Sequence, residues 1–155
     1  MFSSVTGNTR MLAEAIRETL PKENCDYFGV CGGAEAKSEL LYVGFWTDKG
    51  NADADTPGLR VKNIFLFGTA GLCGSEACVR KVLYRVRQSV DASNTFIGEY
   101  MCQGRMPQAV KERYLRMKEQ PEHPANLDML IENFDRALPH PDAADLEKLR
   151  KAVAE

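Results

Sequence analysis

The chain has 155 residues, of which 44% are hydrophobic and 27% charged, and its formal net charge is -2. This length suits one domain with a buried core, and the weak negative charge argues against nucleic acid or an anionic membrane as the main partner. The sequence has no run of about 18 apolar residues that would span a bilayer and no secretory signal pattern at its start. We therefore expect a single domain over residues 1–155.

Apolar residues along the chain alternate between helical spacing and short continuous runs. Residues 11–20 carry apolar side chains at helical spacing, and Pro21 ends that run. Strand-like runs follow at residues 25–30, 40–46, 63–70 and 95–102, and those at 40–46 and 63–70 are as apolar as strands buried on both faces. Helical stripes are predicted at residues 75–90, 107–118 and 127–138, with a C-terminal helical extension at about 140–155.

This order of elements indicates an α/β fold with an open parallel sheet and helices on both faces. Such a domain normally opens with a buried strand of about five or six residues. Only Met1 and Phe2 precede the polar stretch that leads into the first helix. The first strand is therefore expected to be largely missing.

Cysteine and histidine positions do not suggest a metal site. The five cysteines follow no paired spacing and are predicted to be reduced thiols in a cytoplasmic protein. Cys73 and Cys78 have four residues between them rather than the two of a redox dithiol, which favours a packing role. His123 and His140 lie in Pro-rich stretches and are interpreted as turn residues. We assign no catalytic residue, and the nucleophile elbow G-x-S-x-G is absent.

Small hydrogen-bonding residues gather in the stretch SSVTGNT, residues 3–9, directly before the first helix. The free N–H groups and the dipole of a helix start favour an anion there. Neutral donors suffice for one terminal phosphate, and the lysine of a nucleoside triphosphate loop is absent. The composition alone also fits an ordinary helix N-cap, because Ser, Thr and Asn favour that position.

The same stretch resembles the phosphate loop of the flavodoxins, small FMN-binding electron carriers with the approximate pattern T/S-x-T-G-x-T. The matching positions are Ser4, Thr6, Gly7, Asn8 and Thr9, with Val5 contributing its backbone. Residues 44–50 and 67–77 are similar to the two flavin-flanking loops of that family. The resemblance extends from residue 3 to about residue 138. It implies a three-layer sandwich with strand order 2-1-3-4-5, in which the missing first strand would be central.

The resemblance also implies an FMN site at the carboxyl ends of the strands, where ligands of open α/β sheets bind. Trp46 is expected to leave the strand in an exposed loop and to stack on the flavin ring. The other implied cofactor-binding positions in these two loops are Phe45, Thr47, Asp48, Thr69, Ala70, Gly71 and Gly74.

Two departures from the family pattern affect the expected flavin chemistry. Flavodoxins carry glycine where Thr47 stands, so a peptide flip that stabilises the semiquinone is expected to be weaker or to use Lys49 and Gly50. The second loop lacks the tyrosine that covers the outer flavin face, and residues 71–74 would leave that face open.

Three functions remain open on the sequence alone. The first is an FMN-binding carrier that moves electrons between a reductase and an electron-accepting partner protein. The second is an NAD(P)H-dependent reductase of flavins or quinones, and the third is a flavodoxin-like domain that has lost FMN binding. The absence of a second Gly-rich nucleotide motif favours the carrier over the reductase. Formation of a homodimer is left open, and a protein that begins at Met1 is expected to bind FMN poorly.

Overall fold

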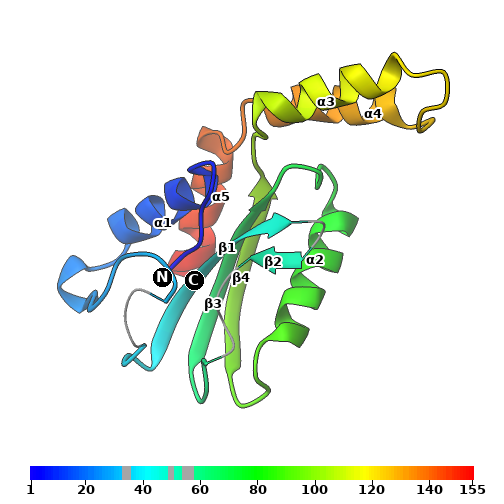
Figure 1. Ribbon diagram of the computed structural model, residues 1–155. Helices are drawn as coiled ribbons and strands as arrows, with labels where there is room; N and C mark the ends of the chain where they lie inside the picture. Colours follow the sequence, from blue (N-terminus) through cyan, green and yellow to red (C-terminus); the bar gives the residue numbers. More distant parts are fainter. Residues whose placement is uncertain (33–35, 49–50, 54–57) are drawn as a thin grey trace.

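A computed structural model describes residues 1–32, 36–48, 51–53 and 58–155. At its centre these residues form a four-stranded sheet of order β2-β1-β3-β4 (Figure 1). The strands are β1 (Leu40–Asp48), β2 (Asn51–Asp53), β3 (Asn63–Ala70) and β4 (Thr95–Gln103). Strands β1, β3 and β4 are parallel, whereas β2 pairs antiparallel with the end of β1. The α/β class and the open sheet are confirmed, but the sheet is mixed rather than purely parallel.

Helices cover both faces of this sheet. They are α1 (Asn8–Thr19), α2 (Glu76–Ser89), α3 (Gln108–Lys118), α4 (Leu127–Ala137) and α5 (Ala143–Ala154), with a short 3-10 turn at Lys22–Asn24. Helices α1 and α5 pack side by side on one face, α2 covers the other, and α3 and α4 form a hairpin beyond the carboxyl end of β4 (Figure 1). Within the described ranges, no helix is long and apolar enough to cross a bilayer.

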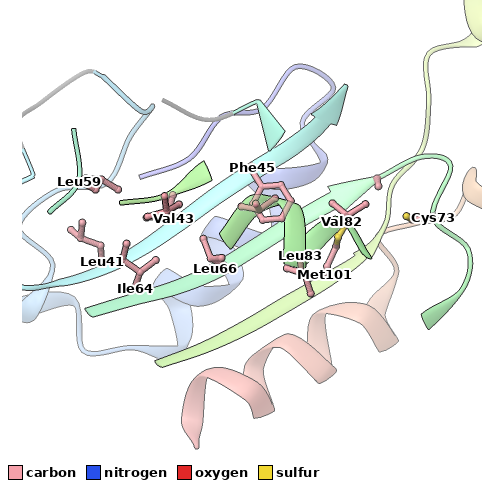
Figure 2. Packing of buried hydrophobic residues seen from close by; sticks show 13 residues of the cluster. Leu41, Val43, Phe45, Leu59, Ile64, Leu66, Cys73, Val82, Leu83 and Met101 are labelled. Carbon is pink, nitrogen blue, oxygen red and sulfur yellow. The ribbon is translucent and has the colours of Figure 1, made fainter. Parts of the chain in front are cut away.

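The core has two parts because successive side chains of a strand point to opposite faces of the sheet. On the α2 face, Val43, Phe45 and Leu66 pack against Val82 and Leu83 (Figure 2). The α1 and α5 face buries another set, which includes Phe2, Leu12, Phe65, Phe67 and Leu149. Full burial of one such side chain stabilises the fold by about 1.5–3 kcal/mol. The two clusters therefore fix the sheet between its helix layers.

Phe2 lies in the position expected for the first strand, between β1 and the segment at Val30. Phe2 forms parallel bridges to Gly44 on β1 and to Val30 on its other side. The lateral order Val30, Phe2, β1, β3, β4 is the expected 2-1-3-4-5 order. The strand predicted at residues 25–30 does not form, and Val30 makes only that bridge. Because Phe2 pairs with this segment through a single bridge, residues 25–30 have few backbone partners with which to form a strand.

A cleft of about 660 Å³ lies where this short ladder ends. The terminal nitrogen of Met1 donates to the carbonyl oxygen of Tyr42 at 2.9 Å, and Gly44 N–H donates to Met1 O at 2.9 Å. Burial lowers the pKa of the Met1 amine. The cleft is bordered by β1, by α1 and by the segment after the 3-10 turn; its apolar lining includes Ile16, Leu20, Phe28, Leu40 and Leu41.

Candidate functional site

Helix α1 begins at Asn8, within the polar stretch at residues 3–9. Its N-cap is Gly7, with φ of 86°, and no side chain caps the helix through Gly7. A Cβ at Gly7 would meet nothing within 4 Å, so glycine is needed there for its backbone conformation alone. Ser4 Oγ accepts the N–H of Arg10 at 3.3 Å. The N–H groups of Asn8 and Thr9 lie in the first turn, where a helix leaves donors without intrahelical partners.

The side chains of the polar stretch point in different directions. Val5 and Thr6 are exposed. Thr9 is fully buried, and its hydroxyl donates to Phe45 O at 3.2 Å and lies 3.1 Å from Thr69 Oγ1. This hydroxyl ties α1 to β1 and β3, which leaves the backbone N–H of Thr9 as its donor toward a phosphate.

Asn8 connects the start of α1 to the segment that follows β4. Its Nδ2 donates to Arg105 O at 2.8 Å, whereas its Oδ1 is buried with no hydrogen-bond partner among the described residues. A Cβ at Gly104 would approach Asn8 Nδ2 to 2.6 Å, so a residue without a side chain is required at that position. The exposed Arg105 therefore lies beside the first turn of α1. We did not predict Gly104 or Arg105 as site residues from the sequence. Their position directly after the parallel strand β4 is the feature that could have indicated them.

Trp46 lies within β1 rather than in the exposed loop predicted for residues 44–50. It is opposite Thr69 on β3 and Asp53 on β2, and it is half-buried. Strand β1 continues to Asp48 because β2 pairs with it; Lys49 and Gly50 lie outside the described residues. By the alternation of a strand, Trp46 faces the α1 layer. Its Nε1 is buried without a hydrogen-bond partner among the described residues.

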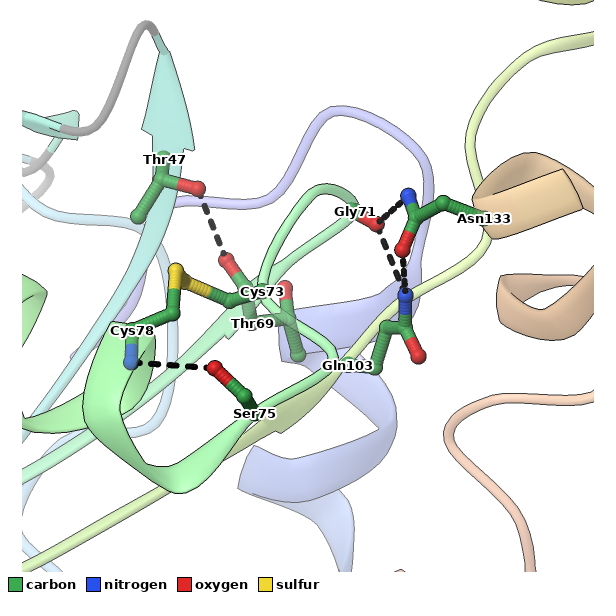
Figure 3. Close-up of a disulfide and its surroundings, with 8 residues drawn as sticks. All are labelled: Thr47, Thr69, Gly71, Cys73, Ser75, Cys78, Gln103 and Asn133. Carbon is green, nitrogen blue, oxygen red and sulfur yellow. Dashed lines mark hydrogen bonds between the residues drawn. A yellow bond between two sulfur atoms is a disulfide. The ribbon is translucent and has the colours of Figure 1, made fainter. Parts of the chain in front are cut away.

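Phe45 and Thr47 face the opposite layer from Trp46. The Phe45 side chain is fully buried in the α2-face core, so only its backbone is near the α1 start. Thr47 Oγ1 donates to Thr69 O at 3.4 Å (Figure 3). These two predicted positions therefore support the strand ends, while Trp46 is the aromatic ring on the α1 side.

Side chains from β4 and α4 form hydrogen bonds to the backbone of the loop between β3 and α2. Gly71 O accepts Gln103 Nε2 at 2.9 Å and Asn133 Nδ2 at 3.1 Å (Figure 3). Ala70 is buried, whereas Gly74 is exposed. Of the predicted positions, Thr69 and Ala70 thus end β3, Gly71 lies on a fixed backbone, and Gly74 lies at the surface.

Cys73 and Cys78 form a disulfide at the end of this loop (Figure 3). This overturns the prediction of reduced thiols at these two positions. The spacing of four residues is sufficient because the first turn of α2 brings Cys78 back beside Cys73, with their Cα atoms 5.4 Å apart. Cys25 is an exposed free thiol and Cys102 a buried one.

The described residues thus bring together the start of α1, the end of β1 and the segments after β3 and β4. Both orphaned buried polar atoms, Asn8 Oδ1 and Trp46 Nε1, belong to this edge. Because buried polar groups normally have partners, these atoms fit a ligand that carries both donors and acceptors. A hollow of about 430 Å³ borders the same polar stretch at Ser4, Val5 and Gly7.

A family model for the flavodoxin domain matches residues 1–154. The chain belongs to the flavodoxin domain family. It is 37% identical over 167 residues to the flavodoxin-like domain-containing protein BilS of Clostridium symbiosum (strain WAL-14163), covering 94% of this chain and 88% of that protein. It is 23% identical over 158 residues to the BilS of Clostridioides difficile (strain CD3), with the same coverage of both chains.

Membership confirms the resemblance inferred from the stretch SSVTGNT and from the two later loops. It implies a flavin-binding redox function for this flavodoxin domain. The edge that carries the start of α1 and Trp46 is therefore the candidate flavin site.

Proposed function

We propose that this flavodoxin domain binds FMN and carries electrons between a reductase and an electron-accepting partner protein. The observation that supports this most directly is the pair of buried atoms without partners among the described residues, Asn8 Oδ1 and Trp46 Nε1, near a helix start whose N-cap Gly7 has no side chain to cap it. When bound, FMN would supply the one- and two-electron chemistry, and the protein would bind and orient it.

The start of α1 would hold the phosphate. The N–H groups of Asn8 and Thr9, together with the Thr6 hydroxyl, are neutral donors, and the helix dipole favours an anion at this end. Arg105 adds a positive charge beside the first turn, although the solvent around this exposed side chain screens its effect. This set of groups suits one terminal phosphate better than a chain of phosphates.

Trp46 would shield one side of the flavin ring, and its Nε1 would find a hydrogen-bond acceptor on the ligand. On the β3–α2 side, the exposed Leu72 and Gly74 form a low rim without an aromatic cover. An open rim of this kind suits the approach of a partner's redox centre. We therefore prefer the electron carrier to a protein that encloses its flavin.

A titration with FMN tests the site because Trp46 is the single tryptophan of the chain. We expect FMN to quench Trp46 fluorescence and to lose its own fluorescence, with both changes complete at one equivalent. Riboflavin has the same ring and lacks the phosphate, so we expect it to bind at least about tenfold more weakly, which corresponds to about 1.4 kcal/mol. Equal affinity for the two compounds would contradict phosphate binding by the start of α1. An absence of quenching would contradict the contact between Trp46 and the flavin ring.

A second experiment separates the carrier from an NAD(P)H-dependent reductase. The FMN-loaded protein is mixed with NADPH without oxygen, and the flavin absorbance is followed. We expect the yellow colour to persist with NADPH alone and to bleach after a separate flavodoxin reductase is added. Rapid bleaching by NADPH alone would assign the domain to the reductases instead.

A further inference from the structure

The Cys73–Cys78 disulfide joins two cysteines in different surroundings. Cys73 follows β3 and is 4% exposed, packed in the α2-face core. Cys78 is the third residue of α2; it is partly exposed and packs against the same core. The Cys78 side chain is therefore more accessible to solvent than that of Cys73.

The position of Cys78 in the first turn of α2 favours the thiolate form, because a helix start stabilises negative charge. The N–H of Cys78 donates to Ser75 Oγ at 3.3 Å, which holds this turn in place. A surface thiol at a helix start is the reactive type of cysteine, and a buried thiol beside it can attack only the sulfur next to it.

The loop does not depend on the disulfide for its position. Gly71 O accepts two amide donors, and Ser75 caps α2 independently of the sulfur atoms. A bridge between residues only five apart in sequence also constrains the unfolded chain less than one that closes a long loop. Stability alone therefore gives a weak reason for this bridge.

We propose that Cys73 and Cys78 form a reversible dithiol–disulfide pair that exchanges with external thiols and disulfides. Cys78 is the exchanging residue and Cys73 the resolving residue. This activity is separate from flavin binding and does not require it.

In the reduced pair, the Cys78 thiolate attacks one sulfur of an external disulfide and expels the other sulfur as a thiolate. The Cys73 thiol then loses its proton to solvent and attacks Cys78 Sγ, which releases the second external thiolate. The released thiolates take up protons, so the pair delivers two electrons and two protons and becomes the disulfide. In the opposite direction, two thiols or one dithiol serve as the reductant and leave as the corresponding disulfide.

The test uses the full chain without FMN and oxidised glutathione as the probe. In Cys73→Ser we expect a stable glutathione adduct at Cys78, located by peptide mass spectrometry. The adduct should form about tenfold faster at Cys78 than at the exposed Cys25, as expected for a thiol whose thiolate form is favoured by tenfold. In the matched variant Cys78→Ser, the buried Cys73 should remain almost unmodified, and in the reduced wild-type chain Cys78 should proceed to the disulfide.

A second measurement does not depend on these variants folding. The wild-type chain is equilibrated in glutathione buffers of graded oxidation, and its free thiols are then trapped and mapped. We expect Cys73 and Cys78 to convert together between the dithiol and the disulfide while the circular dichroism stays native. A disulfide that persists in excess dithiothreitol until the protein unfolds would overturn the proposal. So would a Cys78 in Cys73→Ser that reacts no faster than Cys25.

Discussion

The hydroxyl of Thr9 lies 3.1 Å from the hydroxyl of Thr69, and neither residue is more than 3% exposed. Thr9 belongs to the first turn of α1 and Thr69 to the last residues of β3. The contact fixes the start of the helix against the carboxyl end of the sheet. The direction in which the first N–H groups of α1 point is therefore set by the core beneath them.

Replacement of Thr9 by Val tests this link. The variant keeps the side-chain shape but leaves Phe45 O and the Thr69 hydroxyl without their buried partner. We expect the free energy of unfolding in urea to fall by about 1–3 kcal/mol. FMN affinity should fall as well, because the first turn loses its anchor.

Two matched variants show whether the loss comes from the buried hydroxyl of Thr9. Thr9→Ser keeps the hydroxyl and should retain most of the stability. Thr6→Val changes an exposed hydroxyl and should weaken FMN binding with little effect on stability. A Thr9→Val protein as stable as the wild type would contradict the anchoring role.

Gly7→Ala tests the backbone at the start of α1. The φ of 86° is unfavourable for an L-residue, while the space around the position is empty, so only the backbone opposes the change. We expect a loss of about 1–2 kcal/mol in urea unfolding and weaker FMN binding. Gly58→Ala is the control, because Gly58 also has open space and lies outside the left-handed region. Equal effects of the two substitutions would argue against a special conformation at Gly7.

The stability of the protein should decrease at acidic pH because of Asp142 at the start of α5. The N–H of Asp145 donates to Asp142 Oδ1 at 2.9 Å and holds the pKa of Asp142 below its ordinary value of 3.8. A lowered folded pKa adds stability that is present above pH 3.8 and is lost as the pH falls through the folded value. Asp142→Ala should therefore be less stable than the wild type at pH 7, and the gap should narrow at acidic pH.

Asp142→Asn distinguishes the effect of the carboxylate charge from the effect of the helix-capping hydrogen bond. Asparagine still accepts the N–H of Asp145 but does not titrate, so thermal unfolding should place it nearer to the wild type than Asp142→Ala at pH 7. The acid-dependent part should be absent in this variant. An unchanged gap between the wild type and Asp142→Ala from pH 7 to pH 3 would contradict the assignment.

A designed extension before Met1 tests the cleft at the end of the Phe2 ladder. About five alternating apolar and β-branched residues would continue the ladder along β1 and fill apolar space. We expect a higher midpoint of thermal unfolding and a larger fraction of bound FMN, because the loop at residues 3–9 would gain a rigid support. An extension of equal length with prolines inside cannot join the ladder and is the control. Equal FMN occupancy with and without the apolar extension would contradict the link between this ladder and the loop at residues 3–9.

The sequence predicts the helices and the parallel strands well because their signals are local. Apolar spacing and a stop at Pro21 define the first helix without knowledge of the rest of the chain. The segment at residues 25–30 has the same kind of signal but fails to become a strand, because strand formation depends on a neighbour and Phe2 provides a single bridge. Strand β2 was missed for the related reason that it exists only through its pairing with β1.

The candidate site is predictable in outline and less so in its atoms. The composition of the polar stretch at residues 3–9 fits an anion site or an ordinary helix N-cap, and its resemblance to the flavodoxin phosphate loop favours the anion site. No local pattern reveals that Thr9 points inward or that Arg105, 97 residues from Asn8, lies beside it. The disulfide was missed because the expected C-x-x-C spacing ignores how a helix turn returns the chain on itself.

The carbonyl of Gly71 has a consequence for how the site responds to a change of charge. Because Gln103 and Asn133 both donate to its oxygen, the peptide unit between Gly71 and Leu72 cannot reverse without breaking two bonds, each worth about 1 kcal/mol. This dipole is therefore stationary. A ligand beside this loop would therefore meet the same field from this peptide before and after a change in its own charge.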